Sequence, residues 1–313
     1  MRDAFIAQLT EIAREDPRVV LITGDLGFGV LNNFAEILPQ QFLNAGVAEQ
    51  NMTLMATGMA MEGHVVFTYS IGNFPTLRAL EMIRNDACYH KADVKVVCIG
   101  GGFSYGQLGI SHHATEDLAI LRSLPNLTVV APADDYETKE ATKALITTPG
   151  ACYLRLDRVG SNVDCETGQP FELGKARVLR RGEDLTILTT GGIAREAMQA
   201  ANSLASKGIQ CGVVSIHTLK PIDSEAILKF ARETGGILTL EEHTVIGGLG
   251  GAVAEVCLDA GVMPKKFLRM GLESKFSSVV GDQDYLRQVY GLNAAAVERN
   301  VLSLVGATVG GPV

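Results

Sequence analysis

The residue with the clearest chemical potential is Glu49, in the stretch "GVAEQNM" at residues 46–52. The segment that follows, "TLMATGMAMEG", is almost wholly apolar, which places this acid at the start of an apolar helix. A carboxylate gains from the helix dipole there, but a partly buried one is costly unless it finds a partner or takes up a proton. Two interpretations stay open: an acid that shares a proton with a ligand, or a structural carboxylate that caps the helix or pairs with an arginine.

Three aromatic side chains gather in "FTYSIGNFPTLRALEMIRND" at residues 67–86. The pattern predicts a strand followed by a helix that begins near Pro75, because proline is well tolerated in the first helical turn. Phe67, Tyr69 and Phe74 come close to the carboxyl end of that strand. Aromatic residues more often pack in a core, but rings at a strand-to-helix turn can also stack on a flat heterocycle.

A glycine-rich loop, "GGGFSYGQLGISHHATED" at residues 100–117, supplies two histidines. The glycines permit tight turns and close backbone approaches, and the loop delivers Ser111, His112 and His113 before a helix that starts near Thr115. Adjacent histidines are usually ordinary surface groups. In a loop at the carboxyl ends of parallel strands, a histidine is also well placed as an acid, a base or a donor to a substrate oxygen.

Two further candidate sites follow strand-like segments. In "YLRLDRVG" at residues 153–160, Arg155 and Arg158 either form surface ion pairs or grip a substrate phosphate. In "GDLGFGVLNNF" at residues 24–34, Asp25 follows a strand, where α/β proteins usually place ligands. The glycine spacing of that segment does not match a dinucleotide fingerprint, so a plain loop at the strand end is favoured.

The chain predicts an α/β scaffold for these residues. Near-continuous apolar runs of strand length alternate with helix-length segments, as in parallel sheets covered on both faces. The strand-like runs of the first half are 18–23, 64–69, 94–100, 127–132 and 151–156. A stretch rich in glycine and charge follows between about 160 and 184. Beyond it come strand-like runs at 185–190, 211–216, 236–241 and 266–271, with helical patterns at 193–207, 223–233 and 252–260.

The predicted fold class is therefore α/β, with two three-layer domains at residues 1–165 and 185–313 joined by a linker at 166–184. The length of 313 residues leaves room for two cores. A net charge of −8 argues against a broad nucleic-acid surface.

Neither a membrane partner nor a metal site in this chain is expected. No apolar run reaches the roughly 20 residues of a bilayer span, and the N-terminal segment lacks the features of a signal peptide. The six cysteines lie far apart without a CxxC pair, which suits reduced thiols better than disulfides or zinc. We expect a cytoplasmic protein.

Taken in chain order, these segments resemble the C-terminal part of the transketolase family, which comprises a pyrimidine-binding domain and a small C-terminal domain. "GVAEQNM" is the most specific element, and "TLKPID" (218–223) and "TLEEHTVIGGLGGAVAE" (239–255) resemble the C-terminal domain. The likeness covers essentially the whole chain. It extends to 1-deoxyxylulose-5-phosphate synthase and to the β subunits of 2-oxo acid dehydrogenases.

The resemblance implies that the protein binds thiamine diphosphate. The Glu49 carboxyl would hydrogen-bond N1′ of the aminopyrimidine and favour the imino tautomer, which takes the proton from thiazolium C2. Tyr69 or Phe74, and less strongly Phe67, would stack on the pyrimidine. Asp25 would lie beside the cofactor, at the end of its strand.

The resemblance also implies roles toward the substrate. Ser111-His112 matches a Thr-His of the family that faces substrate oxygens, with His113 beside it. Arg155 would bind a sugar phosphate, with Arg158 as the alternative register. Where transketolases carry Gly-Glu-Asp-Gly before the histidine, this chain has Gly-Gln-Leu-Gly at 106–109. The substrate-contacting Asp is absent, so the usual pentose and hexose phosphate specificity does not follow.

Such enzymes also need a diphosphate-binding domain that holds Mg²⁺, marked by Gly-Asp-Gly and an Asn some tens of residues later. Here Leu26 replaces the second glycine, and Asn32 and Asn33 come too soon. We therefore expect a separate N-terminal transketolase subunit that holds Mg²⁺, in an α2β2 assembly with active sites between subunits. The expected reaction transfers a two-carbon ketol unit from a ketose, as its phosphate, to an aldose. The alternatives are an E1 β subunit of a 2-oxo acid dehydrogenase and a non-catalytic homologue.

Overall fold

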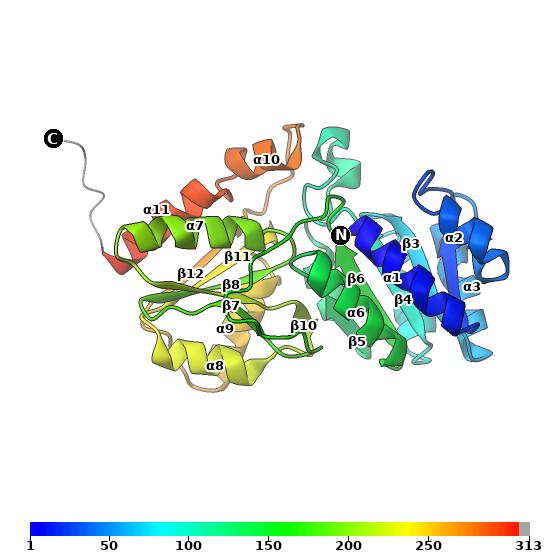
Figure 1. Ribbon diagram of the computed structural model, residues 1–313, viewed down its shortest axis with the longest axis horizontal. Helices are drawn as coiled ribbons and strands as arrows, with labels where there is room; N and C mark the ends of the chain where they lie inside the picture. The colour runs from blue at the N-terminus through cyan, green and yellow to red at the C-terminus, as the bar shows by residue number, and fades with distance from the viewer. Residues whose placement is uncertain (307–313) are drawn as a thin grey trace.

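The computed structural model, which describes residues 1–306, contains two sheets, each covered by helices (Figure 1). The first sheet has seven strands in the order β10-β5-β6-β4-β3-β1-β2. All its pairs are parallel except β10 with β5. Its strands are β1 (Val19–Thr23), β2 (Phe42–Asn44), β3 (Val65–Ile71), β4 (Val94–Ile99), β5 (Leu127–Val130), β6 (Ala151–Leu156) and β10 (Thr218–Lys220).

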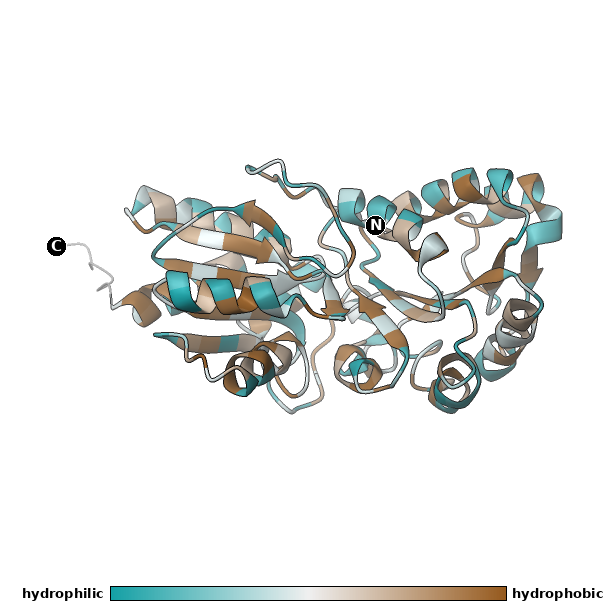
Figure 2. Cartoon of the chain, turned by 90° about the horizontal axis from the view of Figure 1, so that it is seen from below, coloured by the Kyte–Doolittle hydropathy of each residue, from teal (hydrophilic) through white to brown (hydrophobic). Residues whose placement is uncertain are grey.

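Helices cover both faces of this sheet because successive strand residues point to opposite sides. Val19 and Leu21 of β1 face a core shared with α1 and α6, whereas Val20 and Ile22 face a core shared with α3 and α5. Figure 2 shows the strands largely in the brown of apolar residues, while the helices carry both brown and teal. The helices of this domain are α1 (Arg2–Glu15), α2 (Asn32–Ile37), α3 (Glu49–Met61), α4 (Leu80–Met82), α5 (Asp117–Arg122) and α6 (Asp135–Thr147).

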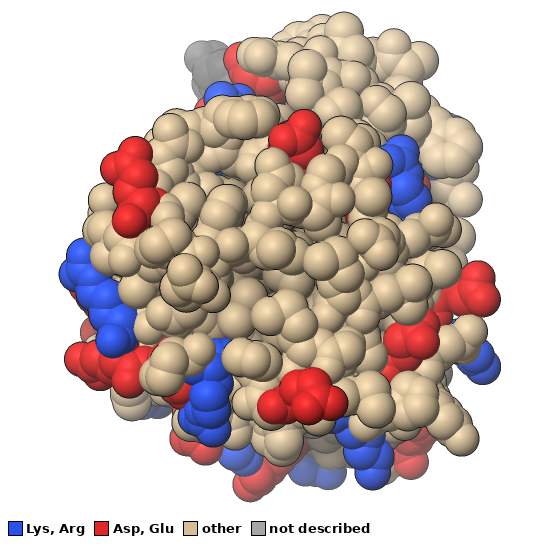
Figure 3. All heavy atoms as spheres, turned by 90° about the vertical axis from the view of Figure 1, so that its right-hand side faces the viewer, with Lys and Arg blue, Asp and Glu red and all other residues tan. Residues whose placement is uncertain are grey.

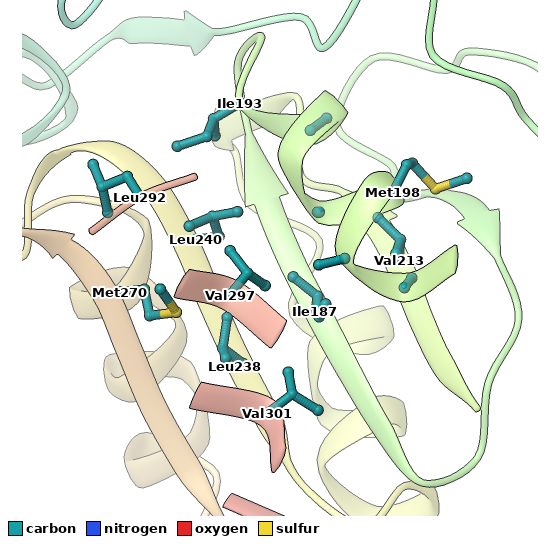
Figure 4. Close-up of a cluster of buried hydrophobic side chains, with 14 of the residues drawn as sticks. Ile187, Ile193, Met198, Val213, Leu238, Leu240, Met270, Leu292, Val297 and Val301 are labelled. Atoms are coloured by element: carbon teal, nitrogen blue, oxygen red, sulfur yellow. The ribbon is translucent and has the colours of Figure 1, made fainter. Parts of the chain in front are cut away.

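The second sheet has five strands in the order β12-β11-β8-β9-β7, with only β7 antiparallel to its neighbour. Its strands are β7 (Arg177–Arg180), β8 (Leu185–Thr190), β9 (Cys211–Ser215), β11 (Ile237–Thr244) and β12 (Phe267–Leu272). The helices are α7 (Ala194–Ser206), α8 (Ser224–Glu233), α9 (Leu249–Asp259), α10 (Gln283–Val289) and α11 (Ala294–Val305). Figure 4 shows Ile187, Leu238 and Leu240 of the central strands facing Val297 and Val301 of α11.

The two three-layer α/β domains and their predicted strands are confirmed. Three short strands were missed: β2, β7 and β10. The predicted linker at 166–184 contains β7, and β10 belongs to the first sheet although it comes from the second half of the chain. The helix expected near Pro75 begins only at Leu80. Residues 307–313 of the predicted second domain lie outside the described residues.

The fold brings the candidate residues to one edge of the first sheet. The parallel strands β1, β3, β4 and β6 all end there, and each is followed by a segment that carries a candidate. This is the edge at which open α/β sheets bind ligands. Within residues 1–306, we find no helix whose length and apolar character would suffice to cross a membrane.

Candidate active site

Glu49 is the first residue of α3 and is only 2% exposed. Ala48 at the N-cap provides no capping side chain, so the acidic side chain complements an otherwise uncapped helix start. Nη1 of Arg78 lies 2.9 Å from Oε2 of Glu49, and the arginine side chain is 51% exposed. Of the two interpretations, the structure thus shows the arginine pair. It leaves Oε1 without a hydrogen-bond partner among residues 1–306.

A continuous series of side-chain contacts leads from Glu49 to Arg158. The guanidinium of Arg78 lies 5.2 Å from the ring centroid of Phe74. That ring meets His112 edge-on at 5.1 Å. The ring of His112 lies 6.3 Å from Tyr105, whose ring is 5.4 Å from the guanidinium of Arg158. We call these six side chains the contact chain: Glu49, Arg78, Phe74, His112, Tyr105 and Arg158.

The turn after β3 is held against the histidine loop by a side-chain hydrogen bond and by a close backbone approach. Nδ2 of Asn73 donates a hydrogen bond of 2.6 Å to the carbonyl of His113. Gly72 has a φ of +47°, and a Cβ atom there would lie 3.0 Å from the carbonyl oxygen of His112. Only glycine suits this conformation and this close approach. The contact between Phe74 and His112 therefore follows from the Asn73 hydrogen bond and from the close approach at Gly72.

The two histidines have different environments. Oγ of Ser111 lies 3.0 Å from Nδ1 of His112, which is partly exposed. Partial burial and the neighbouring His113 lower the pKa of His112, so its imidazole is neutral at pH 7. His113 is buried beside Phe103, with Nε2 3.4 Å from the carbonyl of Gly106. Of the two imidazoles, only that of His112 is accessible, and its role toward a substrate stays a prediction.

The stacking predictions for Phe67 and Tyr69 need correction. These side chains are 0% and 2% exposed, and their ring centroids lie 5.9 and 6.4 Å from that of Phe5 in α1. Because residues alternate along a strand, their parity in β3 directs both rings into the core beneath α1. Phe74, beyond the strand end, is the aromatic residue that joins the contact chain.

Arg155 also has a different role from the one expected. Its Nε donates to Oδ2 of Asp117 at 2.8 Å, and Nη2 donates to the carbonyls of Ala114 and Glu242 at 2.8 and 3.0 Å. The side chain is buried, so this guanidinium is not available to a phosphate. Arg158, three residues later, is exposed and lines a cavity of about 480 Å³ together with Tyr105. Of the two arginines, only Arg158 is accessible, and its role toward a substrate phosphate stays a prediction.

Asp25 lies on the exposed loop after β1. It exchanges two hydrogen bonds with Asn44: its backbone N–H donates at 3.1 Å, and Nδ2 of Asn44 donates to its carboxylate at 2.9 Å. These bonds tie the loop to the end of β2. The preceding Gly24 lies against the site, because a Cβ atom there would be 3.7 Å from both Cγ of Glu49 and Oγ of Ser70. A role of Asp25 toward the cofactor stays a prediction.

Sequence reasoning missed Arg78 and Tyr105. Arg78 stands in the aromatic turn, but its partner Glu49 is 29 residues away and no local pattern indicates the pair. Tyr105 is an aromatic residue in the glycine-rich loop, a signal that was present in the sequence. Within residues 1–306, no group of three or more His, Cys, Asp or Glu side chains is arranged to hold a metal ion.

Known proteins share both domains. Residues 1–161 match the family "Transketolase, pyrimidine binding domain", and residues 174–297 match "Transketolase, C-terminal domain". A putative transketolase C-terminal section of Methanocaldococcus jannaschii is 39% identical, over 96% of this chain and 95% of the relative. One subunit of an apulose-4-phosphate transketolase of Phocaeicola vulgatus is 37% identical, over 97% of each chain.

A solved structure agrees along nearly the full length. It is described as a split gene transketolase in an inactive β4 tetramer, is 36% identical, and covers 98% of both chains with a TM-score of 0.86. The matches to both family domains, the relatives and this structure lead to one conclusion: the chain belongs to the transketolase family.

Proposed function

We propose that this chain is the C-terminal subunit of a split transketolase, and that it transfers a two-carbon ketol unit from a ketose phosphate to an aldose together with a separate N-terminal subunit. The contact chain carries the proposal. It places a buried carboxyl, an aromatic ring, a neutral histidine and an exposed arginine along one sheet edge. Relatives described as a transketolase C-terminal section and as one subunit of a transketolase support the division into two subunits.

The transketolase family implies thiamine diphosphate, and the side chains at this edge fit its aminopyrimidine half. Oε1 of Glu49 is free to accept a hydrogen bond from the cofactor. The half-buried ring of Phe74 lies near it, because Arg78 contacts both side chains. Oγ of Ser70, which like Glu49 lies next to Gly24, is buried without a hydrogen-bond partner among residues 1–306. When bound, the cofactor supplies the electron sink for cleavage of the bond next to a ketose carbonyl.

The residues of this chain then have distinct tasks. Glu49 holds a proton between its carboxyl and the pyrimidine nitrogen, while Arg78 keeps the carboxyl oriented through Oε2. His112, neutral at pH 7, donates a hydrogen bond to a substrate oxygen or accepts its proton. Arg158 binds the phosphate of the ketose through two N–H groups of its guanidinium.

An apolar face beside Glu49 is the proposed surface for partner subunits. Figure 3 shows few charges on the end of the molecule that carries α2 and α3. Large exposed apolar side chains there include Phe28, which is 80% exposed, and Val47, Leu54 and Met61. A patch of this kind marks a protein interface. In our proposal it is buried in an α2β2 assembly, in which the N-terminal subunit holds Mg²⁺ and the diphosphate. The free state of all six cysteines supports a cytoplasmic location.

The test is reconstitution with a separately encoded subunit that carries the Gly-Asp-Gly and downstream Asn signature. The chain alone should bind thiamine diphosphate negligibly, and the pair should transfer ketol units from a ketose phosphate to an aldose. Glu49→Gln in the pair should lower kcat by about two to four orders of magnitude, the usual value of acid–base catalysis. Tight binding or turnover by the chain alone would refute the split.

Two outcomes would select the alternatives. Turnover that requires a lipoyl protein instead of an aldose would identify a 2-oxo acid dehydrogenase component. A reconstituted pair whose properties do not change in Glu49→Gln would indicate a non-catalytic homologue. Arg78→Gln is a useful companion variant, because it removes the ion pair and leaves the carboxyl in place.

A further inference from the structure

Glu242 of β11 reaches from the second domain to the loop that carries His112. Its side chain is buried, and Oε1 accepts a hydrogen bond of 2.5 Å from the backbone N–H of Phe103. Gly102 precedes this contact with a φ of +60°, and a Cβ atom there would lie 2.5 Å from the same oxygen. The loop thus approaches the carboxyl as closely as glycine permits.

The same carboxyl is held from the other side by α10. Nε of Arg287 donates to Oε2 of Glu242, and Nε2 of Gln283 lies 3.0 and 3.2 Å from its two oxygens. The side chain of Arg287 is 4% exposed. A charged group buried this deeply requires partners in a fixed geometry, because each unsatisfied hydrogen-bonding position is costly.

Arg287 and Gln283 also hold the segment that follows β6. Oδ2 of Asp157 lies 3.2 Å from Nε2 of Gln283 and 3.5 Å from Nη2 of Arg287. Asp157 directly precedes Arg158, the exposed arginine of the contact chain. One arginine and one amide of α10 therefore bind a carboxylate from each domain.

Further contacts fix the same histidine loop to the second domain. The N–H of Thr244 donates to the carbonyl of Thr115 at 2.8 Å. The ring of Phe103 stacks on Tyr290 with centroids 5.3 Å apart. Both ends of the loop around His112 thus rest on the second domain.

We propose that Glu242, Gln283, Arg287 and Asp157, here called the inter-domain cluster, are positioning residues that set His112 and Arg158 relative to Glu49. This inference rests on the proposed function. The second domain then contributes to catalysis without contacting the reacting atoms. Buried ion pairs add little net stability compared with apolar packing, but they determine geometry, and a displacement of about 1 Å in an active site can cost on the order of a hundredfold in rate.

The principal variant is Glu242→Gln in the reconstituted enzyme. Phe103 and Arg287 donate to different oxygens of Glu242. In glutamine one of these positions becomes an NH₂ donor, so one of the two donors loses its acceptor and the loop or α10 must shift. We expect kcat to fall by about ten- to a hundredfold and the KM of the ketose phosphate to rise. The affinity for thiamine diphosphate should change by a smaller factor than kcat, because Phe74 meets the shifted loop only through His112.

Glu137→Gln is the matched control. Glu137 is also buried and also joins the domains: its Oε1 lies 3.2 Å from Nη1 of Arg177, and its Oε2 accepts from Oγ of Ser215 at 3.0 Å. These partners lie outside the loop at 100–116. This variant should lower the melting temperature as Glu242→Gln does, with kcat within about twofold of the wild type. Equal loss of kcat in both variants would overturn the proposal.

Hydrogen exchange at the backbone amides of residues 100–116 gives a readout that does not depend on activity. Exchange should accelerate in Glu242→Gln and remain unchanged in Glu137→Gln. Unchanged exchange in Glu242→Gln would overturn the positioning role. If exchange accelerates in Glu242→Gln but the reconstituted wild-type pair transfers no ketol unit, the proposed function is refuted and the structural role of the cluster is not.

If Glu242→Gln does not fold, Gln283→Ala replaces it, since this half-buried amide carries no charge. It should loosen the same loop and lower kcat by a smaller factor. Wild-type kcat and exchange in that variant would overturn the proposal.

Discussion

Arg155 and Arg158 stand three residues apart, and the structure predicts opposite consequences of replacing each by leucine. Arg155→Leu deprives Asp117, whose side chain is 0% exposed, of its ion-pair partner. It also removes the guanidinium donor to the carbonyl of Glu242, whereas the carbonyl of Ala114 still accepts from the N–H of Gly102. Breaking a buried pair costs about 3–5 kcal/mol, and the lost hydrogen bond to the Glu242 carbonyl adds about 1 kcal/mol. The expected loss of about 4–6 kcal/mol is comparable to the whole unfolding free energy of many domains.

Arg158→Leu should leave stability almost unchanged. Its guanidinium is exposed, and its contact with the ring of Tyr105 is worth about 0.5–1 kcal/mol. A charge-assisted bond to a phosphate is worth about 1.5–3 kcal/mol. The KM of a phosphorylated ketose should therefore rise about ten- to a hundredfold, and that of an unphosphorylated ketose should not change.

Urea unfolding of the chain and steady-state kinetics of the reconstituted pair test both expectations. A double variant, Arg155→Leu with Asp117→Asn, should recover part of the lost stability, because removal of both charges avoids an unpaired buried carboxylate. The reasoning would be refuted by an Arg155→Leu protein that keeps wild-type stability and loses affinity for phosphorylated substrates, while Arg158→Leu has no effect.

Two more results are expected. Phe74→Ala in the reconstituted pair should weaken thiamine diphosphate binding about fivefold or more, because the ring contact is lost. Tyr69→Phe should leave the binding unchanged. Calorimetric titration of both variants checks this, and equal effects would contradict the proposed site. Burial raises the pKa of Glu241 to about 7 from an ordinary value of 4.5. The folded protein therefore binds the Glu241 proton more tightly than the unfolded chain does. Proton binding at Glu241 stabilises the fold below about pH 4.5, and the unfolding free energy falls by about 3 kcal/mol as pH rises from there through 7. Glu241→Gln should remove this decline from the unfolding free energy measured between pH 5 and 8, and an unchanged pH profile would contradict it.

Local patterns were sufficient for the two-domain α/β architecture and for the start of α3 at Glu49. Strands buried on both faces are continuous apolar runs, so they are recognisable without knowledge of their neighbours. The motif around Glu49 and the order of the other motifs were also sufficient to identify the family. By contrast, β7 and β10 are only four and three residues long, and pairing to a distant strand is what makes them strands.

The composition of the site depended on tertiary structure. Sequence shows that Phe67 and Tyr69 share one face of β3, but not that α1 covers that face. It shows two arginines near the end of β6, but not that Asp117, 38 residues earlier in the chain, engages Arg155 and leaves Arg158 exposed. The physical reason is that periodicity is a property of a few successive residues, whereas burial and ion pairing depend on which distant segment packs against them.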